Sequence, residues 1–180
     1  MSIGSFVSSA LRLFEEGKYD VALSLACSAV DATSAKMFPN ESKNNVRYKE
    51  FLKKNMRVIT TFGMPGLSAG GIRMKCKNIP GIKTDAEQMA GLEDIIYHII
   101  RCGLIHQCEI EEVIEFTQRT MLGDFEKKFG IPYAIIIGLL MSVILAKENE
   151  NENILTVHQL NLNGINVDLN SLWGKESRGI

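Results

Sequence analysis

The chain has 180 residues, a length typical of one domain, and a chain of this size can bury a core without disulfides or metals. Its hydrophobic share of 46% and charged share of 23% are those of a globular protein and exclude a disordered or collagen-like chain. The four cysteines form no CxxC pair and no signal peptide is recognised, which predicts reduced thiols and a cytoplasmic protein.

Charge is unevenly distributed along the chain. Residues 36–83, the basic block, hold eleven Lys or Arg and two Glu, a balance of +9. Residues 85–126, the acidic block, hold ten Asp or Glu and two Arg, a balance of −8. The basic block indicates a surface that binds a polyanion, whereas the alternative is a solvated surface whose charges pair with the acidic block. The residues predicted to bind RNA are Lys49, Lys53, Lys54 and Arg57.

The first half of the chain has the pattern of three helices and a loop. A helix is predicted over Ile3–Glu16, where Gly17 can end it as the residue after the C-cap. A second helix is predicted to begin with Asp20 as N-cap and to end near Phe38, before a proline. A third is predicted over residues 41–62. Residues 63–83 hold five glycines and two prolines, which predicts a loop.

The next elements are predicted from a capping pattern and an uncharged run. Residues 84–87, Thr-Asp-Ala-Glu, have the form of a capping box and predict a fourth helix that continues toward Arg101. Residues 111–117 have the composition of a strand. Residues 131–146 are sixteen residues without a charge. This run favours a buried core helix over a membrane span, because a span needs roughly 20 apolar residues.

The C-terminal part predicts a β-hairpin. Apolar residues alternate strictly over residues 160–169 on both sides of Asn163-Gly164, which is typical of a type I′ turn, and Trp173 is expected to pack beside it. The predicted fold is mainly α, an antiparallel bundle of about five helices with a small C-terminal β-hairpin. We expect a single domain over residues 1–180, with a helical core over about 1–146 and the hairpin over about 154–173.

Several common catalytic motifs are missing from the sequence: it has no GxGxxG after a strand, no phosphate loop ending in Gly-Lys-Ser/Thr and no HExxH. His98, Cys102 and His106 are spaced four residues apart and suggest zinc, but three such ligands along one helix span about 12 Å. Two of them with a distant ligand would be needed, so no metal and no cofactor are predicted. A cysteine nucleophile with a histidine base stays open as an alternative.

Arg101 is followed by four residues and then His106. This spacing resembles the R-x4–6-H motif of the HEPN superfamily (higher eukaryotes and prokaryotes nucleotide-binding domains), and the run Arg-Cys-Gly-Leu-Ile-His looks like the motif region of its bacterial members. Residues 17–22 resemble the family's opening helices, and the resemblance covers roughly residues 1–146. It implies a helical, homodimeric, metal-independent endoribonuclease, with a toxin or effector of a bacterial defence system as its setting.

The two motif residues suit RNA cleavage chemically. His106 would act as acid or base near neutral pH, and Arg101 would hold the scissile phosphate. Five residues apart on one helix, the two side chains point about 140° apart, so a second subunit or a loosened helix at Gly103 would have to complete the site. The alternative structural interpretation makes His106 a core residue and Arg101 an ion-pair partner.

Two other functions are retained as alternatives. One is a non-catalytic HEPN-like dimer that binds a nucleotide, RNA or a partner protein of a defence or toxin–antitoxin system. It is favoured by Cys102, because many active members of the superfamily have Asn, Asp or His directly after the arginine. The other is a structural or regulatory subunit of an assembly. No membrane partner is expected.

Overall fold

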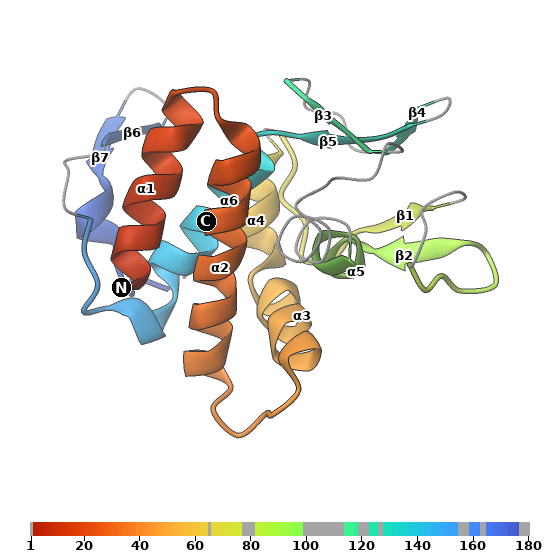
Figure 1. Ribbon diagram of the computed structural model, residues 1–180, viewed down its shortest axis with the longest axis horizontal. Coiled ribbons are helices and arrows are strands. Elements are labelled where there is room, and N and C mark those ends of the chain that lie inside the picture. Colours follow the sequence, from red (N-terminus) through yellow and green to blue (C-terminus); the bar gives the residue numbers. More distant parts are fainter. Residues whose placement is uncertain are drawn as a thin grey trace.

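Helices make up most of the regular structure of the protein, and three small sheets flank them (Figure 1). The computed structural model describes residues 2–64, 66–76, 82–98, 114–118, 123–125, 128–154, 159–162 and 165–176. The mainly helical fold expected from the sequence is therefore confirmed. The sequence predicted one strand and one hairpin, whereas the described residues hold seven strands in three sheets.

The first two helices lie side by side as an antiparallel pair (Figure 1). α1 covers Ile3–Glu15 and begins with a capping box formed by Ser2 and Ser5, which the sequence analysis did not identify. The chain turns at Gly17, whose φ of 73° suits a residue without a side chain. α2 covers Tyr19–Met37, and its N-cap is Lys18. The prediction of Asp20 as N-cap was wrong, since Asp20 lies within the first turn.

The third predicted helix is in fact two helices. α3 covers Asn44–Lys54 and α4 covers Met56–Gly63, with Asn55 between them. The side-chain amide of Asn55 donates a hydrogen bond to the carbonyl oxygen of Phe51 at 3.0 Å. Asparagine side chains compete in this way with regular helical bonding, and the single helix predicted over residues 41–62 was wrong for that reason.

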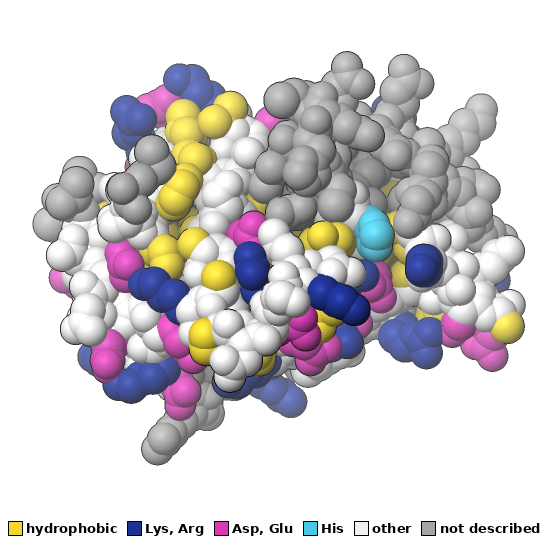
Figure 2. All heavy atoms as spheres, turned by 60° about the horizontal axis from the view of Figure 1, so that its bottom comes forward, with side chains coloured by type: hydrophobic (Ala, Val, Ile, Leu, Met, Phe, Trp, Pro, Cys, Tyr) yellow, Lys and Arg dark blue, Asp and Glu magenta, His cyan; other side chains and the backbone are white. Residues whose placement is uncertain are grey.

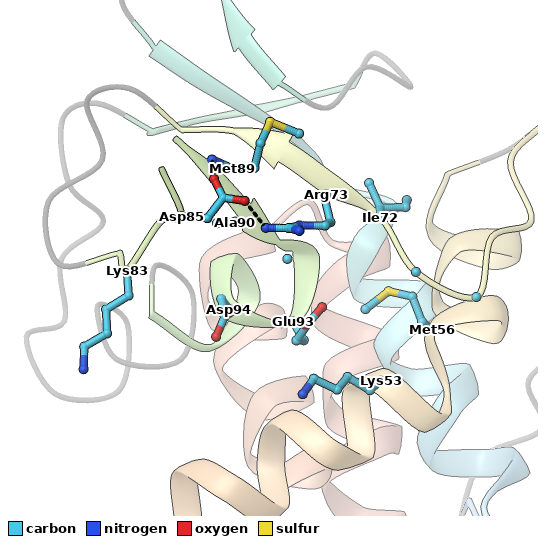
Figure 3. A pocket seen from close by; sticks show the side chains of 13 residues that line it. Lys53, Met56, Ile72, Arg73, Lys83, Asp85, Met89, Ala90, Glu93 and Asp94 are labelled. Carbon is cyan, nitrogen blue, oxygen red and sulfur yellow. Dashed lines mark hydrogen bonds and ion pairs between the residues drawn. The ribbon is translucent and has the colours of Figure 1, made fainter. Parts of the chain in front are cut away.

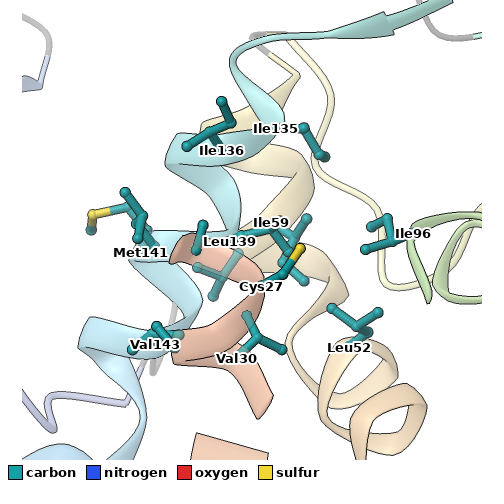
Figure 4. Packing of buried hydrophobic residues seen from close by; sticks show 14 of the residues in the cluster. Cys27, Val30, Leu52, Ile59, Ile96, Ile135, Ile136, Leu139, Met141 and Val143 are labelled. Carbon is teal, nitrogen blue, oxygen red and sulfur yellow. The ribbon is translucent and has the colours of Figure 1, made fainter. Parts of the chain in front are cut away.

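The uncharged run near residue 140 forms the buried helix at the centre of the molecule. α6 covers Ile135–Leu145, and ten of its eleven residues are buried. It packs against α2 and α4, with Ile59, Leu139 and Val30 close together at the contact (Figure 4). The buried core helix is confirmed, although it begins later than residue 131 because a strand precedes it. Of the helices that the structure describes, none is long and apolar enough to cross a membrane.

The helix predicted to start at the capping pattern of residues 84–87 was wrong at its beginning. Here the chain forms a hairpin of β1, Arg73–Lys75, and β2, Met89–Gly91, joined by antiparallel pairing. The Asp85 carboxylate accepts hydrogen bonds from the backbone N–H groups of Glu87 and Met89, both at 2.9 Å. An aspartate that closes a turn uses the same chemistry as a helix cap, so the sequence pattern could not separate the two.

The helix begins only after this hairpin. α5 covers Leu92–Ile95, and a π-helical turn continues it over residues 96–98. The backbone N–H of Leu92 donates to the carbonyl oxygen of Ile72 at 2.9 Å, which ties the start of α5 to the start of β1. Residues 63–83, predicted as a loop, therefore contain β1.

Two further sheets complete the fold. β3, Ile114–Thr117, pairs in parallel with β5, Lys128–Pro132, and β4, Gly123–Phe125, pairs with β5 in antiparallel. The predicted strand over residues 111–117 is confirmed from Ile114 onward. The predicted C-terminal hairpin is confirmed as β6, Gln159–Leu162, and β7, Ile165–Asp168. Its turn residues, Asn163 and Gly164, lie outside the described residues.

Short 3-10 turns flank the hairpin and complete the packing at this end of the molecule. They cover Lys147–Asn149 and Leu169–Leu172. Trp173, which follows the second turn, is buried in the core as the sequence predicts.

A close crossing of α4 and α6 allows a test of the core. A Cβ atom added at Gly138 would clash with the carbonyl oxygen of Ile59. It would also lie 3.0 Å from the backbone nitrogen of Gly63. We therefore expect Gly138→Ala to lower the free energy of unfolding by about 2 kcal/mol or more. In an uncrowded helix the same substitution would raise it by roughly 1 kcal/mol, because alanine has the higher helix propensity.

The matched control is Gly71→Ala, where an added Cβ would meet nothing within 4 Å. Its free energy of unfolding should stay within about 0.5 kcal/mol of wild type. Urea titrations of the three proteins measure both effects. A Gly138→Ala protein as stable as wild type would contradict the close crossing.

Candidate functional site

The two predicted catalytic residues, Arg101 and His106, lie outside the described residues, as do Cys102 and Cys108. The last described residue before them in the chain is His98, at the end of the π-helical turn after α5. The residues predicted to bind RNA are all described, and they lie on α3 and α4.

These four cations lie in different surroundings. Lys49 forms an ion pair with Asp94 at 2.6 Å, and Lys53 forms one with Glu50 at 3.0 Å. Lys54 lines a separate hollow, together with Met37 and the residues at the end of α6. Arg57 is exposed at the start of α4, with its guanidinium beside Gly70.

Much of the basic block is paired with carboxylates. Lys49–Asp94 and Arg73–Asp85 join the basic block to the acidic block, and other cations of the block pair with acids within the block or outside both blocks. These other pairs are Lys36–Glu152, Arg47–Asp31 and Lys53–Glu50. On the face shown in Figure 2, positive and negative side chains are interspersed. The described part of the basic block is thus not a uniformly positive surface.

A cleft of about 330 Å³ lies between the end of α3, the β1–β2 hairpin and the start of α5 (Figure 3). We call it the polar cleft. Its volume is at the lower end of the range of small-ligand sites. Three cations and three carboxylates line it: Lys53, Arg73, Lys83, Asp85, Glu93 and Asp94. Met56, Ile72 and Met89 supply apolar surface. The sequence analysis had placed only Lys53 of these charged residues in a binding site.

Asp85 holds one wall of the polar cleft in place. Its carboxylate accepts the two backbone hydrogen bonds of the hairpin turn and also pairs with the guanidinium of Arg73. The pKa of Asp85 lies below its ordinary value. The hydrogen bond from the backbone N–H of Met89 contributes most to this, and the bond from Glu87 and the nearby Arg73 charge add to it. Asp85 is therefore charged at neutral pH and fixes the direction of Arg73 along the wall.

Three polar side chains meet where α3 passes α5. The Lys49 ammonium lies 2.6 Å from Oδ1 of Asp94 and 3.4 Å from Nε2 of His98. It also lies over the ring of Tyr97, 5.2 Å from the ring centre. We call Lys49, Asp94 and His98 the lysine–histidine cluster. Partial burial and the nearby Lys49 charge lower the pKa of His98, Asp94 opposes this, and Lys83 adds a smaller lowering effect.

A second hollow, of about 270 Å³, is apolar and lies far from these charges in the chain. Leu11 and Phe14 of α1, Leu140 and Ile144 of α6, and Leu169 line it. It has Glu15 and Gln159 as its polar lining residues. It offers no arrangement of acids, bases or cations for chemistry.

No group of three or more His, Cys, Asp or Glu that could hold a metal is found in the part of the chain that the structure describes. The zinc alternative of the sequence analysis needs Cys102 or His106 beside His98, and these two residues lie outside that part.

Comparison with known proteins identifies the family. The Rv1289 family model matches residues 2–178. The chain belongs to the Rv1289 family. Uncharacterized protein Rv1289 of Mycobacterium tuberculosis is 25% identical over 169 residues, covering 89% of this chain and 77% of that protein. Uncharacterized protein Mb1320 of Mycobacterium bovis has the same identity and coverage. No solved structure matches the chain.

The family match corrects the resemblance drawn from Arg101 and His106. A model of the Rv1289 family covers nearly the whole chain, and no HEPN family matches it. The assignment to the HEPN superfamily was therefore wrong. An arginine and a histidine at one of a few allowed spacings occur often by chance in a chain of this length, and the pattern alone did not identify a family.

The lowered pKa of His98 predicts a change of stability with pH. The unfolded chain takes up a proton at this histidine near its ordinary pKa of about 6.5, whereas the folded chain resists it. The contribution of neutral His98 to stability is thus fully present above pH 6.5. It is lost progressively as the pH falls through the lowered folded pKa.

We therefore expect the free energy of unfolding of wild type to fall between pH 7 and pH 5, and to fall less in His98→Gln, which cannot take up this proton. Urea unfolding of both proteins at several pH values between these limits makes the comparison. An equal pH dependence in the two proteins would show that His98 titrates as in the unfolded chain.

Proposed function

We propose that the protein binds RNA, that the polar cleft takes one nucleotide of the strand, and that the bound strand is cleaved without a metal. The observation that carries the binding part is the side-chain composition of the cleft. Lys53, Arg73 and Lys83 offer hydrogen-bond donors to phosphate oxygens, and the three carboxylates offer acceptors to sugar hydroxyls and base amino groups. Met56, Ile72 and Met89 offer apolar surface for a base.

The catalytic part of the proposal comes from the chemistry of two residues. Cleavage without a metal requires a group that moves the 2′-hydroxyl proton and a cation that stabilises the charge on the phosphate. We assign proton transfer to His106 and the phosphate to Arg101, which is permanently charged and can bind two oxygens at once. Both residues follow closely in the chain after α5, which lines the polar cleft. A homodimer, a cytoplasmic setting and a partner protein of a defence system belong to the same proposal.

A second candidate function is the binding of a free nucleotide without cleavage. The charges of the polar cleft favour it, because its three cations face three carboxylates and the cleft has no net charge. A strand of RNA gains affinity from many phosphate contacts, while a single nucleotide needs one phosphate site and acceptors for its base and sugar. Titration with a nucleoside monophosphate and with a short RNA of the same base separates the two functions.

Two neighbouring lysines of α3 give a matched test of the binding site. Lys53 lines the polar cleft, whereas Lys54 lines the hollow beside Met37. We expect Lys53→Ala to weaken binding of a labelled single-stranded RNA several-fold and to reduce the slope of log K against log salt by about 0.7, the value of one phosphate contact. Lys54→Ala should leave both unchanged. Equal losses in the two variants would place the binding surface elsewhere.

The cleavage proposal is tested on the same RNA in the presence of EDTA. We expect His106→Ala to lower the cleavage rate by at least about 10²-fold, the typical contribution of one proton-transfer group. Arg101→Lys should also lose activity, because an ammonium does not bind two phosphate oxygens as a guanidinium does. Thermal unfolding of each variant is measured in parallel. Retained cleavage by a folded His106→Ala protein would remove this histidine from the mechanism.

A further inference from the structure

The segment between α4 and β1 ends in two glycines at one end of the polar cleft. We call its residues 66–72 the glycine loop, and two threonines of α4 hold its first part. The buried hydroxyl of Thr60 accepts a hydrogen bond from the backbone N–H of Ala69 at 3.0 Å. The hydroxyl of Thr61 donates to that of Ser68 at 3.0 Å. The glycine loop is therefore fixed against α4 directly before the two glycines.

Gly70 and Gly71 present backbone without side chains to the polar cleft, which both of them line. A Cβ atom added at Gly71 would meet nothing within 4 Å, and one at Gly70 would meet only the guanidinium of Arg57, at 3.9 Å. Neither glycine N–H donates a hydrogen bond to any residue that the structure describes. Bare backbone beside a cation suits phosphate, because no side chain keeps the phosphate oxygens away from the N–H groups.

Arg57 stands just outside the polar cleft, where its guanidinium lies beside Gly70. It is exposed, and among the described residues no carboxylate forms an ion pair with it. Lys53 and Arg73, which line the cleft itself, each have such a partner. An arginine without a carboxylate partner has all five of its N–H donors available for a ligand.

Lys53 and Arg57 lie on the same side of the chain, although they belong to α3 and α4. Helical hydrogen bonding continues between the two helices, since the N–H of Asn55 donates to Phe51 at 3.1 Å and that of Ile59 donates to Asn55 at 3.0 Å. Residues four apart in a helix have Cβ atoms roughly 5–6 Å from each other. The two cations therefore form a row that leads from the polar cleft to the glycine loop.

We infer that Arg57 and the glycine loop form a second phosphate site, which binds the next phosphate of an RNA strand whose nucleotide occupies the polar cleft. This inference rests on the proposed binding of RNA. Figure 3 shows Met56 and Ile72 at the end of the cleft next to the glycine loop and Lys83 at the other end. A strand that leaves the cleft past Met56 and Ile72 meets Gly70 and then Arg57.

The second site selects a strand over a free nucleotide. A nucleoside monophosphate has one phosphate, which the cations of the cleft bind. The two phosphates of a diphosphate share an oxygen atom, whereas the phosphates of a strand are separated by a ribose. Only the strand therefore has the phosphate spacing to occupy the cleft and the site at Arg57 together.

The test compares three ligands made with deoxyribose, which lack the hydroxyl that cleavage requires. They are a nucleoside monophosphate, its diphosphate, and a dinucleotide of the same base with a terminal phosphate. We expect wild type to bind the dinucleotide several-fold more tightly than the monophosphate, with a slope of log K against log salt that is larger by about 0.7. The diphosphate should show no gain in affinity that depends on Arg57.

Two variants disrupt the second site in different ways. Arg57→Gln removes the cation, and Gly70→Ala keeps the cation but adds a methyl group beside it. In both, the dinucleotide should lose its gain in affinity while the monophosphate binds as in wild type. Lys53→Ala should weaken the binding of both ligands, because it acts within the cleft. Both second-site variants should keep the melting temperature of wild type, since Arg57 is exposed and the space at Gly70 admits a Cβ atom.

The matched control is Arg12→Gln. It removes an exposed arginine of α1, which lies on the other side of α2 from the β1–β2 hairpin (Figure 1). This variant should bind all three ligands as wild type does. An equal loss in Arg12→Gln and Arg57→Gln would show a general effect of charge and would overturn the second site.

The other outcomes separate the inference from the function on which it rests. If wild type binds neither these ligands nor a short single-stranded RNA, both the proposed function and the inference are overturned. If wild type binds the RNA but gains nothing from the second phosphate, the inference alone is overturned. A dinucleotide gain that survives in Arg57→Gln or in folded Gly70→Ala would overturn it too, as would a gain for the diphosphate that is lost in Arg57→Gln.

Discussion

The close contact of α4 with α6 determines where the other elements of the structure can lie. Gly63 and Gly138 are both at this contact, and a Cβ atom at Gly63 would lie 3.0 Å from Cα of Ile135. The two helices approach nearly as closely as their backbones allow, and the uncharged surface of α6 is buried by α4 on one side and by α2 on another. α4 continues from α3 through Asn55, so the position of α6 also determines where α3 presents Lys49 and Lys53.

The opposite wall of the polar cleft depends on hydrogen bonds more than on packing. Asp85 closes the turn before β2, and the backbone bond between Leu92 and Ile72 holds the start of α5 against β1. The two walls meet through the ion pair of Lys49 and Asp94. The packed helices α4 and α6 support one side of the polar cleft, and the hydrogen-bonded hairpin of β1 and β2 forms the other. Together they place positive and negative side chains around the cleft. This arrangement favours a ligand with a phosphate and several polar groups.

The sequence predicted the parts of the fold that depend on local, repeated patterns. The sixteen uncharged residues near α6 predicted burial, Gly17 predicted the turn after α1, and strict alternation around residues 163–164 predicted the C-terminal hairpin. The sequence did not predict where side chains compete with the backbone. Asp85 closes a turn although its neighbours look like a helix cap, and Asn55 divides one predicted helix into two.

The candidate site was predictable only in part, because it is built from contacts distant in sequence. The cations of the basic block could be counted, but their pairing with Asp94 or Glu50 follows from how α3 packs beside α5. His98 was considered only as a zinc ligand, and its contact with Lys49, 49 residues earlier, has no local signal. The spacing of Arg101 and His106 suggested the HEPN superfamily, and the match to the Rv1289 family contradicts that assignment.

The central claim, that the polar cleft takes a nucleotide of RNA, is tested most directly by backbone amide chemical shifts of the protein titrated with a short single-stranded RNA. The account predicts that the changes cluster at Arg73, Ala90, Glu93 and Asp94 around the cleft. Amides around the apolar hollow, such as those of Leu11 and Ile144, should not move. Shifts centred on that hollow, or no shifts at RNA concentrations that saturate binding, would contradict the account.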